Sequence, residues 1–445
     1  MTRTVLFAGG GTAGHVFPAL AVARELVTTG DWDPVFVGTR GRLEERLVPE
    51  AGFEFHLVDA LPLPRRPSVG LLRLPGSLRR SRGQVSELLA RRDVVAAATF
   101  GGYVSFPVSW AAGRADIPLL LHEQNAVPGL ANQFAARWAD RIAVTFPSST
   151  ARFGKRSRTL VTGNPVRDEI LALDRDAVRA AARRRFELDV ERPTVLVFGG
   201  SQGARSINRA IAKSAREWGD LDLQIIHAAG TKLHEEAIDM WRAEVGDDPD
   251  HGPTVRILDF IDDMSLAYAA ADVVVCRAGA TSISELTVLG LPAVLVPYPA
   301  ATRDHQTANA RALAATGAAV TVEDGRLSGR TIVDALAPWI RDPAARAEAS
   351  LRARAFGRRE AARLVADAVR GMVEGVDLTP GSAPPDAPGD ALALPETDEA
   401  ALDEAFAESA RARTEQIGAV VASWEETDRT WVDPAAPVDP DDEDR

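Results

Sequence analysis

The chain has 445 residues, 46% of them apolar, and a formal net charge of −12. A chain of this length is too long for one ordinary hydrophobic core, so we expect two domains. It holds one cysteine, Cys276, which excludes an intramolecular disulfide and fits a reducing cytoplasm. No run of about 18 apolar residues occurs, so the sequence predicts no transmembrane helix.

The acidity of the chain belongs to its C-terminal part. Residues 376–445 hold 19 acidic and 4 basic side chains, a net charge of −15, and residues 1–375 therefore carry +3. A mildly basic body can approach an anionic membrane or a diphosphate. Lysine and arginine do not interleave with aromatic residues in any run, so we expect no nucleic-acid partner.

Short apolar strands alternate with helical stretches through residues 1–375. After Val5–Ala8, too short for the apolar core of a signal peptide, we expect a helix over 16–29. Further strands are expected at 35–37, 94–98, 118–121, 142–144, 194–198, 223–227, 255–258, 273–276 and 293–296. This alternation predicts an α/β fold of two Rossmann-like domains with parallel sheets, joined near residues 163–167. Ligands of such sheets bind at the carboxyl ends of the strands.

The C-terminal segments differ from this pattern. One helix is expected over Pro343–Val373, and because no strand follows it, it can cross back to brace the first domain. From Thr379 onwards proline, glycine and aspartate are typical of a linker. Glu396–Trp424 has the spacing of an acidic amphipathic helix, and Val432–Arg445 is predicted to be disordered. We interpret this tail as a solvated appendage, with a partner-binding helix as the alternative.

Two glycine-rich turns each follow a short apolar strand. Gly9–His15 follows Val5–Ala8, and Gly199–Arg205 follows Val195–Phe198. A glycine turn between a strand and a helix presents backbone N–H groups at the positive end of the helix dipole, which favours a phosphate or diphosphate. Two such turns predict two nucleotide-type domains that share a cleft and handle a phosphorylated donor and a second substrate.

A dinucleotide cofactor is the weaker interpretation of the first turn. Gly9, Gly11 and Gly14 match G-x-G-x-x-G, but that fingerprint also needs an acidic residue after the second strand. The segment Val37–Arg40 contains none. NAD or FAD is therefore not expected, and no other cofactor is predicted.

His15 is the candidate general base. It stands at the start of the helix after the first turn, where the positive helix end lowers the pKa of a histidine and keeps it neutral. The alternative is a histidine that only caps or packs. Its place at a strand-end cleft favours chemistry, and polar clusters at 101–103, 122–125, 277–285 and 304–306 follow other predicted strands.

Two charged residues are candidates for binding a nucleotide. Glu285 lies about one turn inside the helix after Gly279, where a carboxylate can bind a ribose diol; the alternative is an acid favoured by the helix dipole. Arg167 can contact a phosphate or form a surface salt bridge. Asp262-Asp263 more plausibly starts a helix over 264–271 than binds a metal. Without a metal, helix N-termini and an arginine must stabilise a departing diphosphate.

The segment Leu61–Arg82 mixes apolar side chains with six arginines and no acid. Such a stretch can rest on an anionic bilayer, with leucines in the interface and arginines at the headgroups. The alternative is an amphipathic helix that packs its leucines inward. The residues predicted to face the membrane are Leu63, Arg65, Arg66, Leu71, Leu72, Leu74, Arg79 and Arg80.

Together, these loops resemble the MurG family of bacterial glycosyltransferases, which make lipid II. The matching strings cover residues 1 to about 375 in order, and as a set they are highly specific: GGGTAGHVFPAL (9–20), GGYVSFP (101–107), HEQNAVPGLAN (122–132), GNPVR (163–167), GGSQGAR (199–205), FIDDM (260–264), CRAGATSISE (276–285) and DHQTANA (304–310). Ala13 stands where a glycine is common in the family, and Thr281 where some members are apolar.

The resemblance implies the GT-B architecture and an activity. The enzyme would transfer N-acetylglucosamine from UDP-GlcNAc to the C4 hydroxyl of MurNAc-pentapeptide on undecaprenyl diphosphate (lipid I), with inversion and without a metal. It would work as a peripheral protein on the cytoplasmic face of the cell membrane, and cell-wall or cell-division proteins are further candidate partners. The implied divisions are 1–165 for the acceptor and membrane, 166–355 for the donor, 356–375 for a terminal helix and 376–445 for the tail.

The resemblance also implies roles for individual residues. His15 would be the base, with Glu123 as the lesser candidate. Gly11, Gly14, Gly102 and Tyr103 would bind the acceptor diphosphate. The donor would contact Thr12, Ala13, Gly14, Asn125, Arg167, Ser201, Gln202, Ile261, Ala280, Thr281, Ser282, Glu285 and Gln306.

Two other functions fit parts of the sequence. A UDP-GlcNAc 2-epimerase would share the two-domain architecture, but it would need extra catalytic acids and gives no reason for the Leu61–Arg82 segment. A non-catalytic nucleotide-sugar-binding scaffold would recruit partners through the acidic tail and would tolerate loss of His15.

Overall fold

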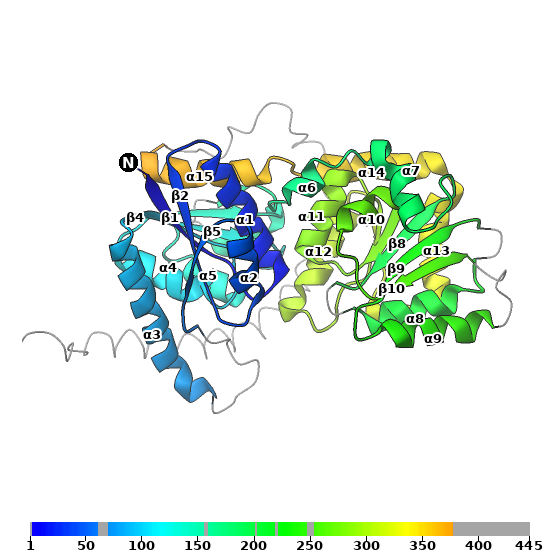
Figure 1. Ribbon diagram of the computed structural model, residues 1–445, viewed down its shortest axis with the longest axis horizontal. Helices are drawn as coiled ribbons and strands as arrows, with labels where there is room; N and C mark the ends of the chain where they lie inside the picture. The colour runs from blue at the N-terminus through cyan, green and yellow to red at the C-terminus, as the bar shows by residue number, and fades with distance from the viewer. Residues whose placement is uncertain are drawn as a thin grey trace, which may run out of the picture.

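The computed structural model describes residues 2–60, 70–154, 159–200, 203–218, 221–246 and 253–376. The chain forms two lobes, each built on one parallel β-sheet with helices on its faces (Figure 1). The predicted α/β fold with two Rossmann-like domains is therefore confirmed. The proposed tail helix at 396–424 lies outside the described residues.

The first lobe holds a seven-stranded sheet in the order β3-β2-β1-β4-β5-β6-β7. Its strands are β1 (Arg3–Ala8), β2 (Trp32–Gly38), β3 (Glu54–Leu57), β4 (Val94–Thr99), β5 (Leu119–Glu123), β6 (Arg141–Val144) and β7 (Thr159–Val161). The connecting helices are α1 (Ala13–Val27), α2 (Leu43–Glu50), α3 (Gly70–Arg91), α4 (Ser105–Arg114), α5 (Leu130–Ala135) and the 3₁₀ helix η1 (Pro147–Phe153). Helices cover both faces, so the central strands are apolar runs without polar alternation.

The second lobe holds a six-stranded sheet in the order β10-β9-β8-β11-β12-β13. Its strands are β8 (Thr194–Phe198), β9 (Gln224–Ala228), β10 (Thr254–Leu258), β11 (Val273–Cys276), β12 (Ala293–Leu295) and β13 (Ala319–Thr321). Its helices are α6 (Asp168–Leu171), α7 (Arg175–Arg185), α8 (Arg205–Ser214), α9 (His234–Val245), α10 (Met264–Ala270), α11 (Ala280–Leu289), η2 (Thr302–Asp304), α12 (His305–Ala314), η3 (Asp324–Arg326), α13 (Gly329–Arg341) and α14 (Pro343–Phe356).

The prediction of one helix over Pro343–Val373 is wrong. The structure has α14 and then α15 (Ala361–Glu374), with a break at Gly357. Gly357 has extended backbone angles, and a Cβ there would lie 2.9 Å from the carbonyl oxygen of Thr287. The helix therefore breaks where the chain packs closely against Thr287 of α11, and α15 begins as a separate helix on the first lobe.

Helix α15 packs on the first lobe beside α1 (Figure 1). Val365 and Val369 share a hydrophobic core with Phe7 of β1 and Val16 of α1. The guanidinium of Arg370 donates a hydrogen bond to the carbonyl oxygen of Glu25 at 2.8 Å. The last described helix thus ties the second lobe to the first, and it begins beside the connection at residues 163–167, because a Cβ at Gly163 would lie 3.4 Å from the Cβ of Ala361.

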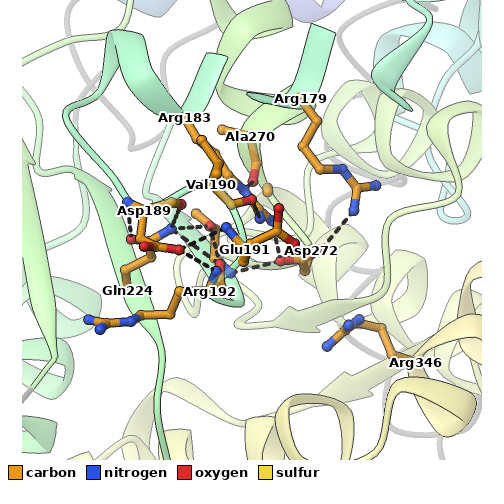
Figure 2. Close-up of polar contacts among 12 residues, drawn as sticks. Arg179, Arg183, Asp189, Val190, Glu191, Arg192, Gln224, Ala270, Asp272 and Arg346 are labelled. Atoms are coloured by element: carbon orange, nitrogen blue, oxygen red, sulfur yellow. Dashed lines mark hydrogen bonds and ion pairs between the residues drawn. The ribbon is translucent and has the colours of Figure 1, made fainter. Parts of the chain in front are cut away.

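A buried ion pair organises the amino ends of the second sheet (Figure 2). Arg183 contacts Asp272 at 2.7 Å, and their side chains are 3% and 6% exposed. Asp272 also accepts a hydrogen bond from the N–H of Thr194, the first residue of β8, at 2.8 Å. Arg183 donates to the carbonyl oxygens of Ala270 and Val190, so both charges are satisfied where water is excluded. This edge is occupied by structural contacts, and the opposite edge carries the polar loops.

Helix α3 projects from the first lobe (Figure 1). Leu78 is buried and Arg80 is exposed, so this turn of the helix packs its leucine inward. Arg79 is half-buried. The predicted membrane residues Leu63, Arg65 and Arg66 lie outside the described residues, as do the side chains of Leu71, Leu72 and Leu74. In the part of the chain that the structure describes, every helix is too short or too polar to cross a bilayer.

Candidate active site between the two domains

Residues from the carboxyl ends of both sheets contact one another across the domain boundary. The side chain of Asn309 in α12 accepts a hydrogen bond from the N–H of Ala126 at 2.8 Å and donates to Asn125 Oδ1 at 3.1 Å. Asn309 is fully buried. A Cβ added at Gly14 would lie 3.3 Å from Thr281 Oγ1, which shows how closely α1 and α11 approach. The polar loops of the two lobes therefore form one site.

The first glycine turn and the loop after β4 hold the ring of His15. Gly102 has φ +88°, and a Cβ there would collide with the carbonyl oxygen of Gly10, so only glycine allows the two loops to touch. A Cβ at Gly101 would lie 3.0 Å from His15 Nε2. The imidazole is thus held between the turn after β1 and the turn after β4.

The hydrogen bonds of His15 fix its tautomer. Nδ1 lies 2.9 Å from the carbonyl oxygen of Gly10 and 3.2 Å from Thr12 Oγ1. A carbonyl oxygen only accepts, so Nδ1 carries the proton and Nε2 is left with its lone pair. Burial lowers the pKa of His15 below its usual value, although the Gly10 carbonyl and the charge of Glu44 oppose that shift. The geometry therefore presents a neutral imidazole with a basic Nε2.

Glu123, the second candidate base, is occupied by its own loop. Oε1 accepts from the N–H of Asn125 at 2.9 Å and from its side-chain amide at 3.3 Å. Oε2 accepts from the N–H of Gly129 at 3.1 Å and from Asn132 at 2.8 Å. Burial raises the pKa of this carboxyl, and the four donors act against that rise. These contacts shape the loop and orient Asn125, a predicted donor-sugar contact.

Arg167 and Glu285 contact each other and are both removed from bulk water. The Arg167 guanidinium lies 3.0 Å from Glu285 Oε1, and the two side chains are 18% and 7% exposed. Tyr268 donates its hydroxyl to Glu285 Oε2 at 2.9 Å. Burial raises the pKa of Glu285, and the Arg167 charge and the tyrosine hydroxyl counteract it. Arg167 also lies over the ring of Phe17 from α1, at 5.0 Å from its centroid.

The second glycine turn follows β8 and is described only in part. Gly200 and Gly203 have φ of +83° and +70°, and a Cβ at Gly203 would collide with the carbonyl oxygen of Ala229. The N–H of Gly203 donates to the Gly200 carbonyl at 2.9 Å, which closes the turn before α8. The predicted diphosphate contacts Ser201 and Gln202 lie outside the described residues.

The remaining predicted donor residues lie at other strand ends of the second lobe. Ile261 is buried next to Phe260, whose side chain is half exposed. Ala280, Thr281 and Ser282 form the first turn of α11. Gln306 Oε1 accepts from the N–H of Tyr298 at 2.9 Å, which leaves its amide NH₂ available to a ligand. Arg303 and Asp304, just before Gln306, both have positive φ and form a sharp turn into α12.

Around the first turn, Thr12 and Tyr103 are exposed, whereas Gly11, Ala13, Gly14 and Gly102 are partly buried. Tyr103 packs its ring near Gly11, with Cε2 3.7 Å from the place a Cβ of Gly11 would take. The guanidinium of Arg42 lies 5.9 Å from the centroid of the same ring. Tyr103 and Arg42 therefore border the entrance to the first turn.

Sequence reasoning missed three residues of this site. Glu44 in α2 accepts a hydrogen bond from the N–H of Gly11, although the sequence places it six residues after the end of β2. Asn309 lies within the matching string DHQTANA, which predicts no role for it, and Tyr268 lies outside the matching strings. An acid in the first turn of the helix after β2 is the signal that could have identified Glu44. Tyr268 and Asn309 carry no local signal, because their partners are distant in sequence.

Two facing Rossmann-like domains with these loops at their strand ends have the GT-B architecture, and matches to two family models identify the chain as a glycosyltransferase. Residues 5–144 match the glycosyltransferase family 28 N-terminal domain, and residues 194–365 match the glycosyltransferase family 28 C-terminal domain.

Similar proteins narrow the family further. The chain is 42% identical over 371 residues to the UDP-N-acetylglucosamine--N-acetylmuramyl-(pentapeptide) pyrophosphoryl-undecaprenol N-acetylglucosamine transferase of Clavibacter sepedonicus, covering 83% of this chain and 96% of that protein. It matches the crystal structure of Acinetobacter baumannii MurG at a TM-score of 0.67 and 30% identity, covering 83% of this chain and all of that one. The calicheamicin glycosyltransferase CalG4 shares the fold alone, at 18% identity and a TM-score of 0.60, with 84% of this chain and 99% of that one covered. The chain belongs to the MurG family.

Proposed function

We propose that this chain transfers N-acetylglucosamine from UDP-GlcNAc to the C4 hydroxyl of the muramoyl sugar of lipid I, with inversion and with His15 as the general base. The transferase activity follows from family membership over most of the chain. The observation that supports the base is the His15 ring, whose Nδ1 is committed to the Gly10 carbonyl and whose Nε2 is free to accept a proton.

The chemical step is a single displacement. Nε2 of His15 takes the proton of the acceptor C4 hydroxyl while that oxygen forms a bond to the anomeric carbon of N-acetylglucosamine. The bond from the anomeric carbon to the diphosphate oxygen breaks, and UDP leaves from the opposite side, which inverts the anomeric configuration. A pKa lowered by burial suits this role, because the imidazole is unprotonated when the acceptor binds.

The donor is assigned to the second lobe. We propose that the ribose hydroxyls bind Glu285, that uracil lies against the backbone of Ile261, and that the diphosphate lies at the turn before α8 with Ser201, Gln202 and Arg167. Backbone N–H groups at a helix start and one arginine neutralise the leaving diphosphate without a metal. The contacts proposed around the sugar are Asn125, Gln306, Ala280, Thr281 and Ser282, with Thr12, Ala13 and Gly14 across the domain boundary.

Glu123 is a positioning residue in this proposal. Both of its oxygens already accept hydrogen bonds from the loop that carries Asn125, so a proton taken from a substrate would break that loop. Gly11, Gly14, Gly102 and Tyr103 are proposed to face the acceptor diphosphate, at the edge of the first lobe.

Lipid I lies in a membrane, so the proposal includes a peripheral position on its cytoplasmic face. Residues 1–165 would meet the bilayer and the acceptor, residues 166–355 would hold the donor, and residues 356–375 would join the two. The Leu61–Arg82 segment supports this by its six arginines and leucines without an acid. Cell-wall or cell-division proteins are proposed as further partners.

One assay tests the activity. The protein is incubated with UDP-GlcNAc, with and without lipid I, and UDP release is followed with and without EDTA. Release that requires lipid I and persists in EDTA is expected. Conversion of UDP-GlcNAc without an acceptor would indicate an epimerase, binding without any turnover would indicate a scaffold, and a loss of rate in EDTA would refute the metal-free step.

A second assay tests the membrane surface. Replacing Arg65, Arg66, Arg79 and Arg80 by serine is expected to weaken binding to anionic liposomes. Turnover of a short-chain, water-soluble acceptor should survive, because the site itself is unchanged. Equal losses in both assays would point to a folding defect, and unchanged liposome binding would refute this surface.

A further inference from the structure

A buried carboxylate lies directly beneath the first glycine turn. Glu44, in the first turn of α2, is 1% exposed. Its Oε2 accepts from the N–H of Gly11 at 2.9 Å, and its Oε1 accepts from the N–H and the hydroxyl of Thr39 at 3.2 and 3.0 Å. A buried carboxylate with three donors is a fixed feature of the fold, because each donor would lose its partner if the acid moved.

The glycines around Glu44 leave space for its side chain. A Cβ at Gly10 would lie 2.5 Å from Glu44 Oε1, and all three of its nearest atoms belong to this carboxylate. A Cβ at Gly38, at the end of β2, would collide with Glu44 Cγ and would also lie 2.7 Å from the ring of Phe55. The turn and the strand end are therefore shaped around the carboxylate as well as around the loop after β4.

This arrangement changes what the first turn can bind. A glycine turn at a helix N-terminus normally offers its N–H groups to a phosphate. Here the N–H of Gly11 already donates to an internal anion, and the neighbouring carbonyl of Gly10 accepts the Nδ1 proton of His15. The C=O of Gly10 and the N–H of Gly11 belong to the same peptide unit, so a single peptide group connects the fixed negative charge to the imidazole.

We propose that Glu44 is a positioning residue for glycosyl transfer: it occupies the anion site of the first turn and holds the Gly10 carbonyl where it orients His15. The inference rests on the proposed role of His15 as the base. Because Glu44 already accepts from the N–H of Gly11, we expect the donor diphosphate at the second turn. The acceptor diphosphate proposed beside the first turn would have to use donors other than this N–H.

Electrostatics give this proposal a signature that a merely structural acid would lack. The charged or titratable groups that face His15 are Glu44 from α2, His305 from α12 and His122 from β5. The Glu44 charge raises the pKa of His15, whereas His305 lowers it. Removing the Glu44 charge should therefore lower the pKa of His15 further and make Nε2 a weaker base.

The first experiment compares Glu44→Gln with Glu50→Gln on the same helix. Glu50 is exposed and forms a surface ion pair with Arg46 at 3.0 Å, a contact that contributes little to stability. In Glu44→Gln, kcat is expected to fall by ~10–100-fold, the usual effect of losing a hydrogen-bonded charge, while the KM for UDP-GlcNAc changes little. The control should retain both constants.

An NMR titration separates this proposal from the role of His15 itself. The ring pKa of His15 is measured in protein with ¹⁵N-labelled histidine, and the signal is assigned by its loss in His15→Gln. A lower His15 pKa in Glu44→Gln is expected, and an unchanged pKa in the folded variant overturns the proposal. If the pKa of His15 is lower but kcat is unchanged, Glu44 still sets the pKa of His15, and the result instead refutes His15 as the base.

Gly10→Ala tests the same contact with Glu44 left in place, and a cycle with Glu44→Ala shows whether its effect depends on the carboxylate. Gly10→Ala should lower kcat, because the new methyl group pushes against the carboxylate. In a Glu44→Ala background, Gly10→Ala should lower kcat no further, because the carboxylate atoms that the new methyl group would contact are absent. Gly38→Ala is the matched control, since Phe55 still blocks it in that background. Equal losses from Gly10→Ala in both backgrounds overturn the proposal.

Discussion

The two glycine turns of this chain share one motif and differ in charge. Each joins a buried parallel strand to a helix at the carboxyl edge of its sheet. The first turn already contacts an acid, Glu44, and carries His15 on the helix that follows. Among the described residues, no carboxylate accepts a hydrogen bond from a backbone N–H of the second turn, and only the side chain of Arg205 at its end contacts one, Glu236. A strand–turn–helix unit can therefore support a base or a leaving diphosphate, depending on whether the protein itself supplies an anion at the turn.

The electrostatic reason is the same at both turns. Each helix N-terminus carries a partial positive charge of roughly half a unit. At the first turn this charge is offset by Glu44, which allows a histidine to remain a useful base close to it. At the second turn the charge is left for the leaving diphosphate.

The largest expected effect comes from removing the base of the first turn. His15→Ala should lower kcat by ~10²–10⁴-fold, the usual contribution of a positioned base. The KM for UDP-GlcNAc should barely change, because the donor is assigned to the second lobe. Steady-state kinetics with lipid I measure both constants, and near-normal turnover would remove His15 from the role.

The matching change on the donor side is Glu285→Gln. We expect the Kd of UDP-GlcNAc to rise by ~10–100-fold, since a buried charged acceptor for the ribose is lost, with a smaller effect on kcat. Glu169→Gln is the control, because Glu169 also contacts Arg167, at 3.2 Å, but is 53% exposed. Calorimetric titration measures both affinities. A fall in kcat without a change in Kd would contradict the proposal that the second lobe binds the donor while the first lobe carries the base.

The pH dependence of turnover tests the state of His15. Burial lowers its pKa below the ordinary 6.5, and a base must be unprotonated, so kcat should stay level down to about pH 6.5. Below its own pKa the rate should fall about tenfold for each pH unit, because the neutral fraction falls in that proportion. This acidic limb should move to lower pH in Glu44→Gln and stay in place in Glu285→Gln.

The sequence predicted the strands well and the side-chain partnerships poorly. The strands at 94–98 and 273–276 are buried apolar runs, and the structure has them at nearly the same limits. The strands β3, β7 and β13 were missed, because each lies at an edge of its sheet and is largely exposed or only partly buried. Equally short strands that are fully buried, such as β11, were predicted, because their sequences are apolar runs.

The site shows the same limit. The loops that carry His15 and Glu285 could be predicted, because a glycine turn or polar cluster after a strand is a local signal. The pairing of Arg167 with Glu285 could not, since these residues are 118 positions apart and meet only through the fold. The same holds for the contact of Asn309 with Asn125, which depends on how the two domains lie against each other.

The smallest expected effect comes from Tyr268→Phe, which tests how the proposed donor site orients Glu285. Tyr268 is buried, and its hydroxyl donates to Glu285 Oε2 at 2.9 Å, so it fixes the carboxylate in one orientation. In Tyr268→Phe the ring can keep its edge contact with Phe198, and only the hydroxyl is lost. The Kd of UDP-GlcNAc should rise ~3–10-fold with kcat nearly unchanged, the effect of one hydrogen bond.

A double variant decides whether this effect runs through Glu285. If Tyr268 acts only by orienting that carboxylate, Tyr268→Phe should cost little more affinity once Glu285→Gln is present, because two residues that share one contact do not add. Additive losses would mean that the hydroxyl contacts the donor by itself. A loss of kcat at unchanged Kd would place Tyr268 on the side of the chemistry, and the separation between a base-bearing first turn and a donor-binding second lobe would then fail.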